Sequence, residues 1–375
     1  MMALVSPATG LVLRPDSAHS ISDGVSRWPV IDGIPFLRIS RDALVSVVLA
    51  RLDAGQHDEA LVLLLADQDA WWTGPVAEPE ALHRLVQDRA TLTLREAMAL
   101  LSWGPVADYF AHRWSDPSFI AGLSLVETHW PSPETSFELA CGIGHHLRAL
   151  AQHGVRTMGA DIVFAKLWLA RQFVSPDSTL ICFDAGSRWP IERQRFDLVC
   201  CHDAFYFLEP KQEILDRLNA SAMGGTLLVG HIHNRNWPNL SAGLAITVDQ
   251  LVELFPDGTY YDDAELTDAA AAGRQPRSAE PADLDTVEAF AVMRGKPGSA
   301  SIGLLTIPSD GAELRRNPLY RPDGAVTWPS PRYEAEYAPR ATYPLRSPCP
   351  PRARLDDATR SWARRRELLD LPDRW

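Results

Sequence analysis

The feature that most constrains the fold is the regular alternation of apolar strand patterns with helical patterns between residues 128 and 306. Runs such as SFELA, TLICFDA and FDLVCCHD are largely apolar, and each is followed by a turn and a helical stretch. Strands that are apolar on both faces are typical of parallel sheets covered by helices on both sides. The alternation therefore predicts an α/β fold. Near its end, VEAFAVMRG and SIGLLTIP (301–308) are expected to be two further, adjacent strands.

Three flanking regions differ in composition from this central one. Residues 1–40 hold short apolar runs broken by proline, glycine and aspartate, which indicates a small β region. Residues 41–127 have apolar residues at helical spacing, and Gly55 separates the first two helices of an expected hairpin. Residues 307–375 are rich in proline and arginine, and predict either an arm that wraps the protein or a partly disordered tail. The predicted domains are therefore 1–40, 41–127, 128–306 and 307–375.

The charge balance and the cysteines limit the partners and the compartment. The chain has 36 basic and 48 acidic residues and so a net charge of −12, which argues against non-specific electrostatic binding to nucleic acid. No apolar run reaches the roughly 20 residues that would span a membrane.

The 5 cysteines contain no CxxC pair and fit a reducing cytoplasm. Arginine far outnumbers lysine, which favours a GC-rich bacterial source. We expect a cytoplasmic protein without a nucleic-acid or membrane partner.

The most informative segment is the turn after the strand SFELA. Ala140, Gly142 and Gly144 separate this strand from a helix that begins near His145. Small residues allow a tight turn and let a ligand approach the main chain, and ligands of open α/β sheets bind at the carboxyl ends of strands. A dinucleotide site needs a third small residue in the pattern GxGxxG. Counted from Gly142 that position is Leu147, so the dinucleotide pattern fails.

The segment ELACGIG resembles the first motif of class I S-adenosylmethionine-dependent methyltransferases. In that family an acid in the first strand precedes a small-x-Gly-x-Gly loop; Glu138 matches the acid, and Ala140 stands where glycine is usual. Asp161, at the end of VRTMGAD, and Asp184, in CFDA, match acids that follow the second and third strands. FDLVCCHDAFYFL and MGGTLLVGH match the fourth and fifth strand segments.

The resemblance covers residues 128–306 and implies a Rossmann-like sheet of seven strands with helices on both faces. It implies S-adenosylmethionine as the cofactor, with Asp161 accepting hydrogen bonds from the ribose hydroxyls and Asp184 and Ala185 contacting adenine. The residues expected to hold the cofactor are Glu138, Ala140, Cys141, Gly142, Gly144, Asp161, Ile162, Asp184, Ala185 and His202.

Simpler structural roles exist for several of these residues. Glu138 and Asp161 could cap a loop and a helix. His145 and His146 stand at a helix start, where we expect them to be surface or capping residues. These roles explain single residues but not the shared order of the five motifs.

Candidate catalytic residues follow the fourth and fifth predicted strands. They are His202 and Asp203 after the fourth, and His231 and His233 in GHIHN after the fifth. Methyl transfer is an in-line displacement that depends on positioning, and a base is needed only if the acceptor keeps its proton. A histidine, with a pKa of about 6.5, could take that proton. The H-x-H spacing could also hold a metal ion, but structural histidines are the simplest interpretation, and no metal ligand is assigned.

The N-terminal segments SPATGLVL and WPVIDGIPFL carry a second resemblance, to a short zinc-ribbon-like family whose members accompany and activate methyltransferases. That family reads Cys-Pro-x-Cys at its start, whereas Ser6 and Thr9 stand at these positions and no cysteine precedes Cys141. A tetrahedral zinc site needs thiolate or imidazole ligands. We therefore expect an accessory β region that has lost its metal.

Together these features predict an S-adenosylmethionine-dependent methyltransferase with a small-molecule acceptor, such as a natural-product or sugar-like intermediate. HDAFYF stands where an Asn-Pro-Pro-Tyr motif would indicate methylation of amines in nucleic acid. The alternatives are a non-catalytic S-adenosylmethionine-binding regulator or scaffold, an NAD-dependent oxidoreductase, and a protein-interaction module built on the helical hairpin. A protein partner or a homo-oligomer stays open.

Overall fold

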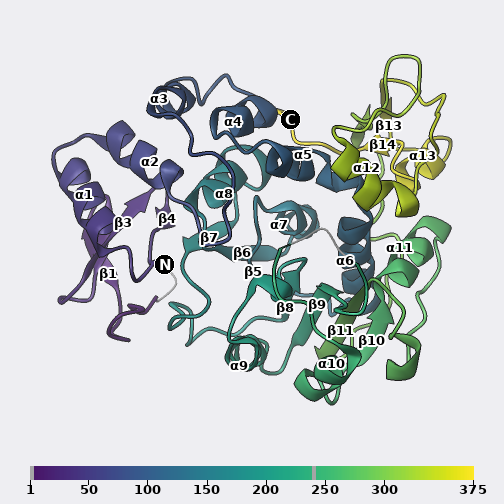
Figure 1. The fold of residues 1–375 in the computed structure, drawn as a ribbon, viewed down its shortest axis with the longest axis horizontal. Coiled ribbons are helices and arrows are strands. Elements are labelled where there is room, and N and C mark those ends of the chain that lie inside the picture. Colours follow the sequence, from purple (N-terminus) through teal and green to yellow (C-terminus); the bar gives the residue numbers. More distant parts are fainter. Residues whose placement is uncertain (1–3, 239–241) are drawn as a thin grey trace.

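A seven-stranded sheet at the centre of the structure confirms the predicted α/β fold (Figure 1). The computed structural model describes residues 4–238 and 242–375. The strands of the sheet are β5 (Thr135–Leu139), β6 (Arg156–Asp161), β7 (Thr179–Cys182), β8 (Leu198–His202), β9 (Thr226–His233), β10 (Thr259–Asp262) and β11 (Ala289–Gly295). They lie in the order β7-β6-β5-β8-β9-β11-β10.

The strands β5 to β9 are parallel, and β11 runs antiparallel to both of its neighbours, β9 and β10. All 8 residues of β9 are buried, as expected for a strand covered on both faces. Because the carboxyl ends of β5 to β9 meet at one edge, the loops that follow them lie close together and can build one site.

Helices pack on both sides of the sheet. They are α6 (Pro117–Thr128), α7 (His145–Ala151), α8 (Phe164–Leu169), α9 (Lys211–Ser221), α10 (Val248–Leu254) and α11 (Asp263–Ala272). Helix α6 packs against β9 and α11, and all 12 of its residues are buried. Figure 1 places α7 and α9 on opposite sides of the strands. Helix α6 is largely apolar, and its few polar side chains, such as Glu127, are hydrogen-bonded within the protein, so it is stable in this enclosed position.

One predicted strand is wrong. Residues 301–308 do not form a strand, and the sheet instead contains β10, which the sequence did not predict. The reason lies in Glu127 of α6, whose carboxylate accepts hydrogen bonds from the backbone N–H groups of Gly303 (3.0 Å), Leu305 and Thr306. A side chain therefore satisfies the donors that a neighbouring strand would otherwise have to pair with.

The N-terminal region is an antiparallel sheet at the edge of the molecule. Its strands are β1 (Arg14–Ser17), β2 (Ser20–Ser22), β3 (Arg27–Ile31) and β4 (Ile34–Pro35). It joins the central sheet where the N–H of Leu37 donates to the carbonyl of Cys182, the last residue of β7, at 2.7 Å. The Thr9 hydroxyl, at a position where the zinc-ribbon family has cysteine, donates to Asp23 at 2.5 Å. The zinc-ribbon ancestry of this sheet stays a prediction.

The segment between the two sheets is helical. It contains α1 (Asp42–Asp53), α2 (His57–Ala66), α3 (Pro79–Gln87), α4 (Leu94–Leu100) and α5 (Pro105–His112). Helices α1 and α2 pack against each other across a turn at Gly55, whose φ of +75° favours glycine. Within residues 4–238 and 242–375, no helix is long and apolar enough to cross a membrane.

The residues after 307 form an arm that packs on the rest of the protein. The arm contains β12 (Glu313–Arg316), α12 (Pro331–Tyr337), β13 (Arg352–Arg354), α13 (Arg360–Arg364) and β14 (Leu368–Leu369). The guanidinium of Arg374 donates to the backbone carbonyls of Arg89, Leu92 and Gln172. The C-terminus therefore returns to the helical segment near α4, as Figure 1 shows.

The Glu127 contact generates a stability prediction. Glu127→Ala is expected to lower the free energy of unfolding by about 3 kcal/mol or more, because it leaves three backbone N–H groups without their acceptor. Urea unfolding followed by circular dichroism measures the change. The matched control is Glu134→Ala, an exposed residue whose loss should cost less than about 1 kcal/mol. Equal effects of the two substitutions would contradict the role given to Glu127.

Candidate active site

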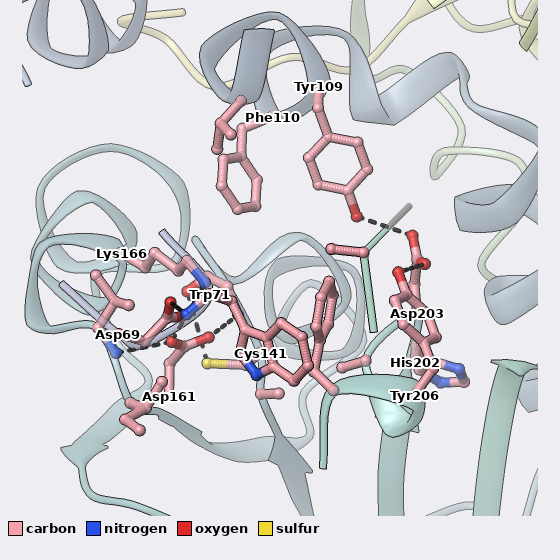
Figure 2. A pocket seen from close by; sticks show the side chains of 18 of the residues that line it. Asp69, Trp71, Tyr109, Phe110, Cys141, Asp161, Lys166, His202, Asp203 and Tyr206 are labelled. Carbon is pink, nitrogen blue, oxygen red and sulfur yellow. Dashed lines mark hydrogen bonds and ion pairs between the residues drawn. The ribbon is translucent and has the colours of Figure 1, made fainter. Parts of the chain in front are cut away.

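A cavity of about 700 Å³ lies at the carboxyl ends of the parallel strands (Figure 2). This volume is within the range of small-molecule sites. Figure 2 shows Asp161 and Lys166 on one side of the cavity, Asp203 and His202 on the other, and Tyr109 and Phe110 between them. We call these two sides the Asp161 half and the Asp203 half.

The glycine loop builds the floor of the Asp161 half. Ala140 and Gly142 both have a φ of +56°, and Gly144, with a φ of +86°, immediately precedes α7. The left-handed conformation of Ala140 explains why glycine is usual there in the family that the segment resembles. A Cβ atom on Gly142 would lie 3.0 Å from the ring of Phe110, so a side chain there would also crowd the cavity.

Asp161, at the end of β6, holds this loop in place. Its carboxylate accepts a hydrogen bond from the N–H of Gly142 at 3.1 Å and another from the N–H of Val163 at 2.9 Å. The ammonium group of Lys166 lies 3.6 Å from the same carboxylate. Asp161 is buried but lines the cavity, so its remaining acceptor positions face a ligand.

Nine of the ten residues expected to hold the cofactor line the cavity, and Gly144 is the exception. Ile162 follows Asp161, and Asp184 and Ala185 follow β7. The carboxylate of Asp184 accepts a hydrogen bond from the N–H of Gly186 at 2.9 Å, which fixes its turn. The motifs that the sequence placed after three separate strands therefore surround one space.

Glu138 is buried below the loop rather than free in the cavity. Its carboxyl group shares a hydrogen bond of 3.0 Å with Nδ1 of His146, and burial raises the pKa of Glu138 to about 7. Burial also lowers the pKa of His146 to about 3, so this imidazole is neutral at neutral pH. The pair contributes a hydrogen bond between β5 and α7 without a full ion pair.

The prediction that His145 and His146 are surface or capping residues is wrong. Both are buried, with 4% and 6% of their surface exposed. The His145 ring lies 4.3 Å from the ring of Trp114, and its Nε2 bonds the carbonyl of Phe110 at 3.0 Å. The fully buried helix α6 and the end of α5 cover this start of α7, which the local sequence could not reveal.

His202, the last residue of β8, packs its ring 4.4 Å from the ring of His146. Neither ring nitrogen of His202 has a hydrogen-bond partner within the described residues, and burial lowers its pKa to about 3. This histidine lines the cavity as a neutral ring between the two halves.

Asp203 is surrounded by donors. Its carboxylate accepts hydrogen bonds from Arg113 (2.7 Å), Tyr109 (2.9 Å) and Tyr206 (2.7 Å). Burial alone would raise the pKa of Asp203, but the charges of Arg113 and His231 hold it well below its usual range. An ionised carboxylate that accepts three hydrogen bonds orients other groups and is a poor proton acceptor.

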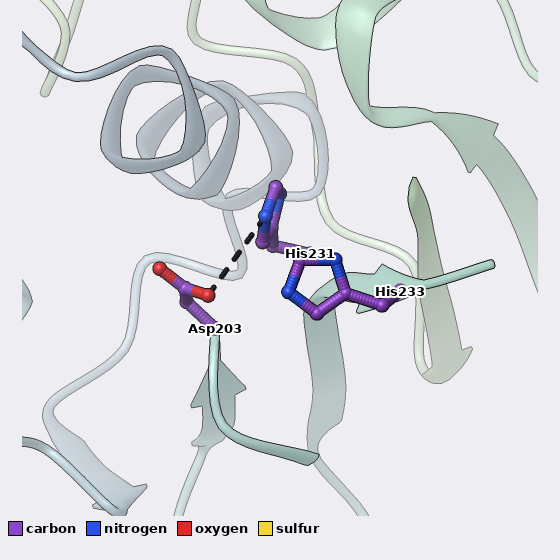
Figure 3. A group of neighbouring side chains, drawn as sticks. All are labelled: Asp203, His231 and His233. Carbon is purple, nitrogen blue, oxygen red and sulfur yellow. Dashed lines mark ion pairs between the residues drawn. The ribbon is translucent and has the colours of Figure 1, made fainter. Parts of the chain in front are cut away.

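His231 and His233, in β9, differ in their environments (Figure 3). His231 lines the cavity; its Nδ1 donates to Asp263 at 3.0 Å, and its Nε2 lies 3.8 Å from Asp203. Burial opposes the charged ring, but Asp263 and Asp203 outweigh it and raise the pKa of His231. His233 lies behind His231, outside the cavity lining, and burial lowers its pKa to about 4.

Several residues of the Asp203 half were missed by sequence reasoning. They come from α5, from the residue that follows it, from the start of α11 and from the arm, and are Tyr109, Arg113, Asp263, Tyr333, Glu336 and Tyr337; all but Asp263, which contacts His231 from behind, line the cavity. Asp263 begins α11 directly after β10, so recognising TYYD as a strand would have marked it as a residue at a strand end. No local pattern marked the arm residues, since they reach the cavity only through tertiary packing.

Asp116 joins the arm to the start of α6. Its fully buried carboxyl group accepts a hydrogen bond from the hydroxyl of Tyr333 in α12. Burial raises the pKa of Asp116 to about 8, against the opposing effects of Tyr333 and Arg113. Burial therefore favours the neutral form of this carboxyl group, although the hydrogen bond from Tyr333 favours the ionised form.

Comparisons with known proteins agree with the sheet topology. A family model described as a methyltransferase domain matches residues 137–222, from β5 to the end of α9. No curated protein matches the chain significantly.

Many solved structures are similar over part of the chain. A Thermotoga maritima S-adenosylmethionine-dependent methyltransferase is 16% identical, with 50% of this chain and 91% of that chain covered and a TM-score of 0.36. A Haloferax volcanii complex of a methyltransferase activator and a methyltransferase is 19% identical, with 50% of this chain and 92% of that chain covered and a TM-score of 0.38. Haemonchus contortus phosphoethanolamine N-methyltransferase 2 with S-adenosylhomocysteine is 14% identical, with 55% of this chain and 61% of that chain covered and a TM-score of 0.38. Because these similarities are low, the assignment of residues 137–222 to a methyltransferase domain rests on the family model and the sheet topology.

The raised pKa of Asp116 predicts a pH-dependent stability. Its folded pKa of about 8 lies above its unfolded value of about 3.8, so the folded state binds the extra proton between these values. The free energy of unfolding is therefore expected to fall as the pH rises from 4 to 8, by up to about 1.4 kcal/mol per pH unit from this group. Asp116→Asn, which stays neutral, should reduce this slope in urea titrations at pH 5, 6, 7 and 8. Asp177→Asn, at an exposed position, is the control. An unchanged slope in Asp116→Asn would contradict the assignment.

Proposed function

We propose that this protein is an S-adenosylmethionine-dependent methyltransferase, which transfers a methyl group to a small-molecule acceptor bound in the Asp203 half of the cavity. A family model of a methyltransferase domain matches residues 137–222 and supports the proposal. The observation that carries this proposal is the single cavity of about 700 Å³, which joins the expected cofactor residues to a second half lined by polar and aromatic side chains. Two adjoining halves allow two bound molecules to be held in line for a displacement, which is where such a reaction gains most of its rate.

The residues of the Asp161 half fit the cofactor. Each oxygen of Asp161 accepts one backbone N–H group and retains a second acceptor position, which the ribose hydroxyls can use. Asp184 and Ala185 would contact adenine. The turn at Ala140 and Gly142 presents backbone to the cavity, which leaves room for a ligand. When bound, the cofactor supplies a methyl group on a sulfonium, which is already activated for transfer.

The Asp203 half would orient the acceptor. Arg113, Tyr109 and Tyr206 fix the carboxylate of Asp203, and His231 faces it from the next strand. Of the four candidate catalytic residues, His231 is best placed to act at the acceptor atom. It lines the cavity, and its Nε2 is 3.8 Å from Asp203 and so is not committed to a hydrogen bond. His202 and Asp203 would shape and orient the site, and His233 supports it from behind.

The enclosure of this half favours a small molecule as the acceptor. Helix α12 of the arm places Tyr333 and Tyr337 on the cavity, where they would exclude water from the reaction. At the rim, the rings of Trp71 and Phe207 lie 5.5 Å apart and offer an aromatic wall to a ring-shaped acceptor. A natural-product or sugar-like intermediate fits this description, whereas a nucleic acid does not suit a chain with a net charge of −12.

The alternative is a regulator that binds S-adenosylmethionine without catalysis. Such a protein would need only the Asp161 half, and the continuation of the cavity into a second half argues against it. An NAD-dependent oxidoreductase is disfavoured because Leu147, fully buried, fills the position of the third small residue.

The first experiment is a calorimetric titration of the protein with S-adenosylmethionine, S-adenosylhomocysteine and NADH. We expect micromolar affinity for the two sulfur compounds and none for NADH. Binding of NADH alone would overturn the proposal. Methyl transfer is then tested by incubating the protein with labelled S-adenosylmethionine and a panel of hydroxylated aromatic and sugar-like compounds. Binding without transfer to any of them would favour the regulator.

Asp161→Ala tests the cofactor site. The loss of two charge-assisted hydrogen bonds to the ribose, worth about 1.5 kcal/mol or more each, should weaken S-adenosylmethionine binding about 100-fold. Calorimetry measures the affinity, and thermal unfolding shows whether the variant is folded. The control is Asp177→Ala, an exposed residue of the loop before β7, which should bind normally. Unchanged affinity in a folded Asp161→Ala variant would show that the ribose is held elsewhere.

A further inference from the structure

Three side chains at the acceptor end of the cavity have the arrangement of a metal site (Figure 3). We propose that Asp203, His231 and His233 bind one divalent transition-metal ion, of the zinc type, which holds and activates a hydroxyl group of the acceptor. The activation step rests on the proposed function, whereas the metal site itself does not.

The distances suit one shared ion. One ligand atom from each of the three residues lies within 4.8 Å of the others. The His231 Nε2 to Asp203 Oδ1 distance of 3.8 Å is too long for a hydrogen bond. Ligand bonds of about 2.0–2.2 Å in a tetrahedral site place the ligand atoms about 3.4 Å apart. The ligand atoms therefore need to approach one another by at most about 1.4 Å around an ion.

The burial of His233 is a second, independent indication of a metal site. Only 4% of its surface is exposed, and neither Nδ1 nor Nε2 has a hydrogen-bond partner within the described residues. Burial of an imidazole without a partner is costly, and native structures rarely leave such groups unsatisfied. A metal ion at the cluster would satisfy one of these nitrogens.

The surroundings orient the other two ligands. Asp263 accepts the Nδ1 proton of His231 at 3.0 Å, which leaves Nε2 as the free nitrogen that points to Asp203. A carboxylate on the far nitrogen is the usual support of a metal-binding histidine. Arg113 and Tyr109 bind Oδ2 of Asp203. The other oxygen, Oδ1, faces His231; it accepts one hydrogen bond, from the hydroxyl of Tyr206 at 2.7 Å, and keeps a second acceptor position for an ion.

The donor set selects the type of metal. Two imidazoles and one carboxylate suit zinc, iron or cobalt, whereas magnesium and calcium prefer oxygen ligands alone. Three protein ligands leave a fourth position open, as in catalytic zinc sites. Asp203 and His231 line the cavity and His233 does not, so the open position faces the cavity.

An acceptor hydroxyl in that position would have a lowered pKa and would release its proton to water. The acceptor oxygen then forms a bond to the methyl carbon while the carbon–sulfur bond of the sulfonium breaks. The electron pair of that bond stays on sulfur and leaves a neutral thioether. The acceptor class that follows is an alcohol or phenol.

The test is the metal content of the full chain, purified without chelator and then loaded separately with Zn²⁺, Co²⁺ and, without oxygen, Fe²⁺. Mass spectrometry of the dialysed protein is expected to find one equivalent of metal per chain. The visible spectrum of the Co²⁺ form should show a four- or five-coordinate ion with nitrogen and oxygen ligands. No stoichiometric binding of any of the three ions would overturn the proposal.

Variants assign the metal to the cluster. His233→Ala is expected to weaken Co²⁺ binding about 100-fold or more, and Asp263→Asn about 10–100-fold. The control is His19→Ala in the N-terminal sheet, which should bind Co²⁺ normally. Metal lost in His19→Ala and kept in His233→Ala would overturn the proposal and place the ion in the N-terminal sheet.

Calorimetry with S-adenosylmethionine separates this proposal from the proposed function. Because His233 lies outside the cavity lining, a folded His233→Ala variant should bind the cofactor as tightly as the unaltered chain does. If His233→Ala does not fold, His233→Gln replaces it. Cofactor binding without metal binding would overturn the metal site alone, and metal binding without cofactor binding would overturn the proposed function alone.

Discussion

The Asp203 half of the cavity depends on the buried ion pair between Arg113 and Asp203. Only 5% and 8% of these two side chains are exposed, so the cost of removing both charges from water has to be offset locally. Tyr109 and Tyr206 donate to Asp203, and Arg113 also donates to Ser118 at 2.8 Å. The pair ties the segment between α5 and α6 to the end of β8. It thereby connects the helical cover of the cavity to the sheet that forms its floor.

This pair also decides how the neighbouring histidines are presented. With one oxygen of Asp203 held by Arg113, the other faces His231, which Asp263 holds from the opposite side. Truncating either member of such a pair would leave an uncompensated buried charge and would disturb every group that the pair positions. The Asp203 half of the cavity is therefore one connected network, whereas the Asp161 half consists of separate loops that follow separate strands.

The arm completes this network from the far end of the chain. Tyr333 reaches Asp116 at the start of α6, and Arg340 lies 3.5 Å from Asp263 and 3.3 Å from Glu288. Glu127, also in α6, binds the backbone of the segment that leads into the arm. Helix α6 is therefore the common support of the sheet, the cavity and the arm, which explains why it is buried on every side.

The elements that could be predicted are those whose structure is set by residues close together in the sequence. The strand and helix patterns of residues 135–233 identified β5 to β9, and the glycine loop, Asp161 and Asp184 could be placed at strand ends from order alone. β10 was missed because TYYD is only four residues long, although the turn residues Pro256, Asp257 and Gly258 precede it. Residues 301–308 were mistaken for a strand because their apolar pattern does not show that Glu127 accepts their backbone hydrogen bonds.

By itself, the sequence determined where the parallel strands lie along the chain and which residues stand at their carboxyl ends, because local periodicity and turn chemistry act over a few residues. Only the tertiary structure decided that Tyr109, Arg113, Asp263 and Tyr337 meet Asp203 and His231, since these residues come from elements up to 228 positions apart. It also decided that Asp203 accepts hydrogen bonds from three side chains and that, within the described residues, His233 is buried without a hydrogen-bond partner. Those properties are set by burial and by which donors lie within about 3 Å, and no local pattern in a sequence records either.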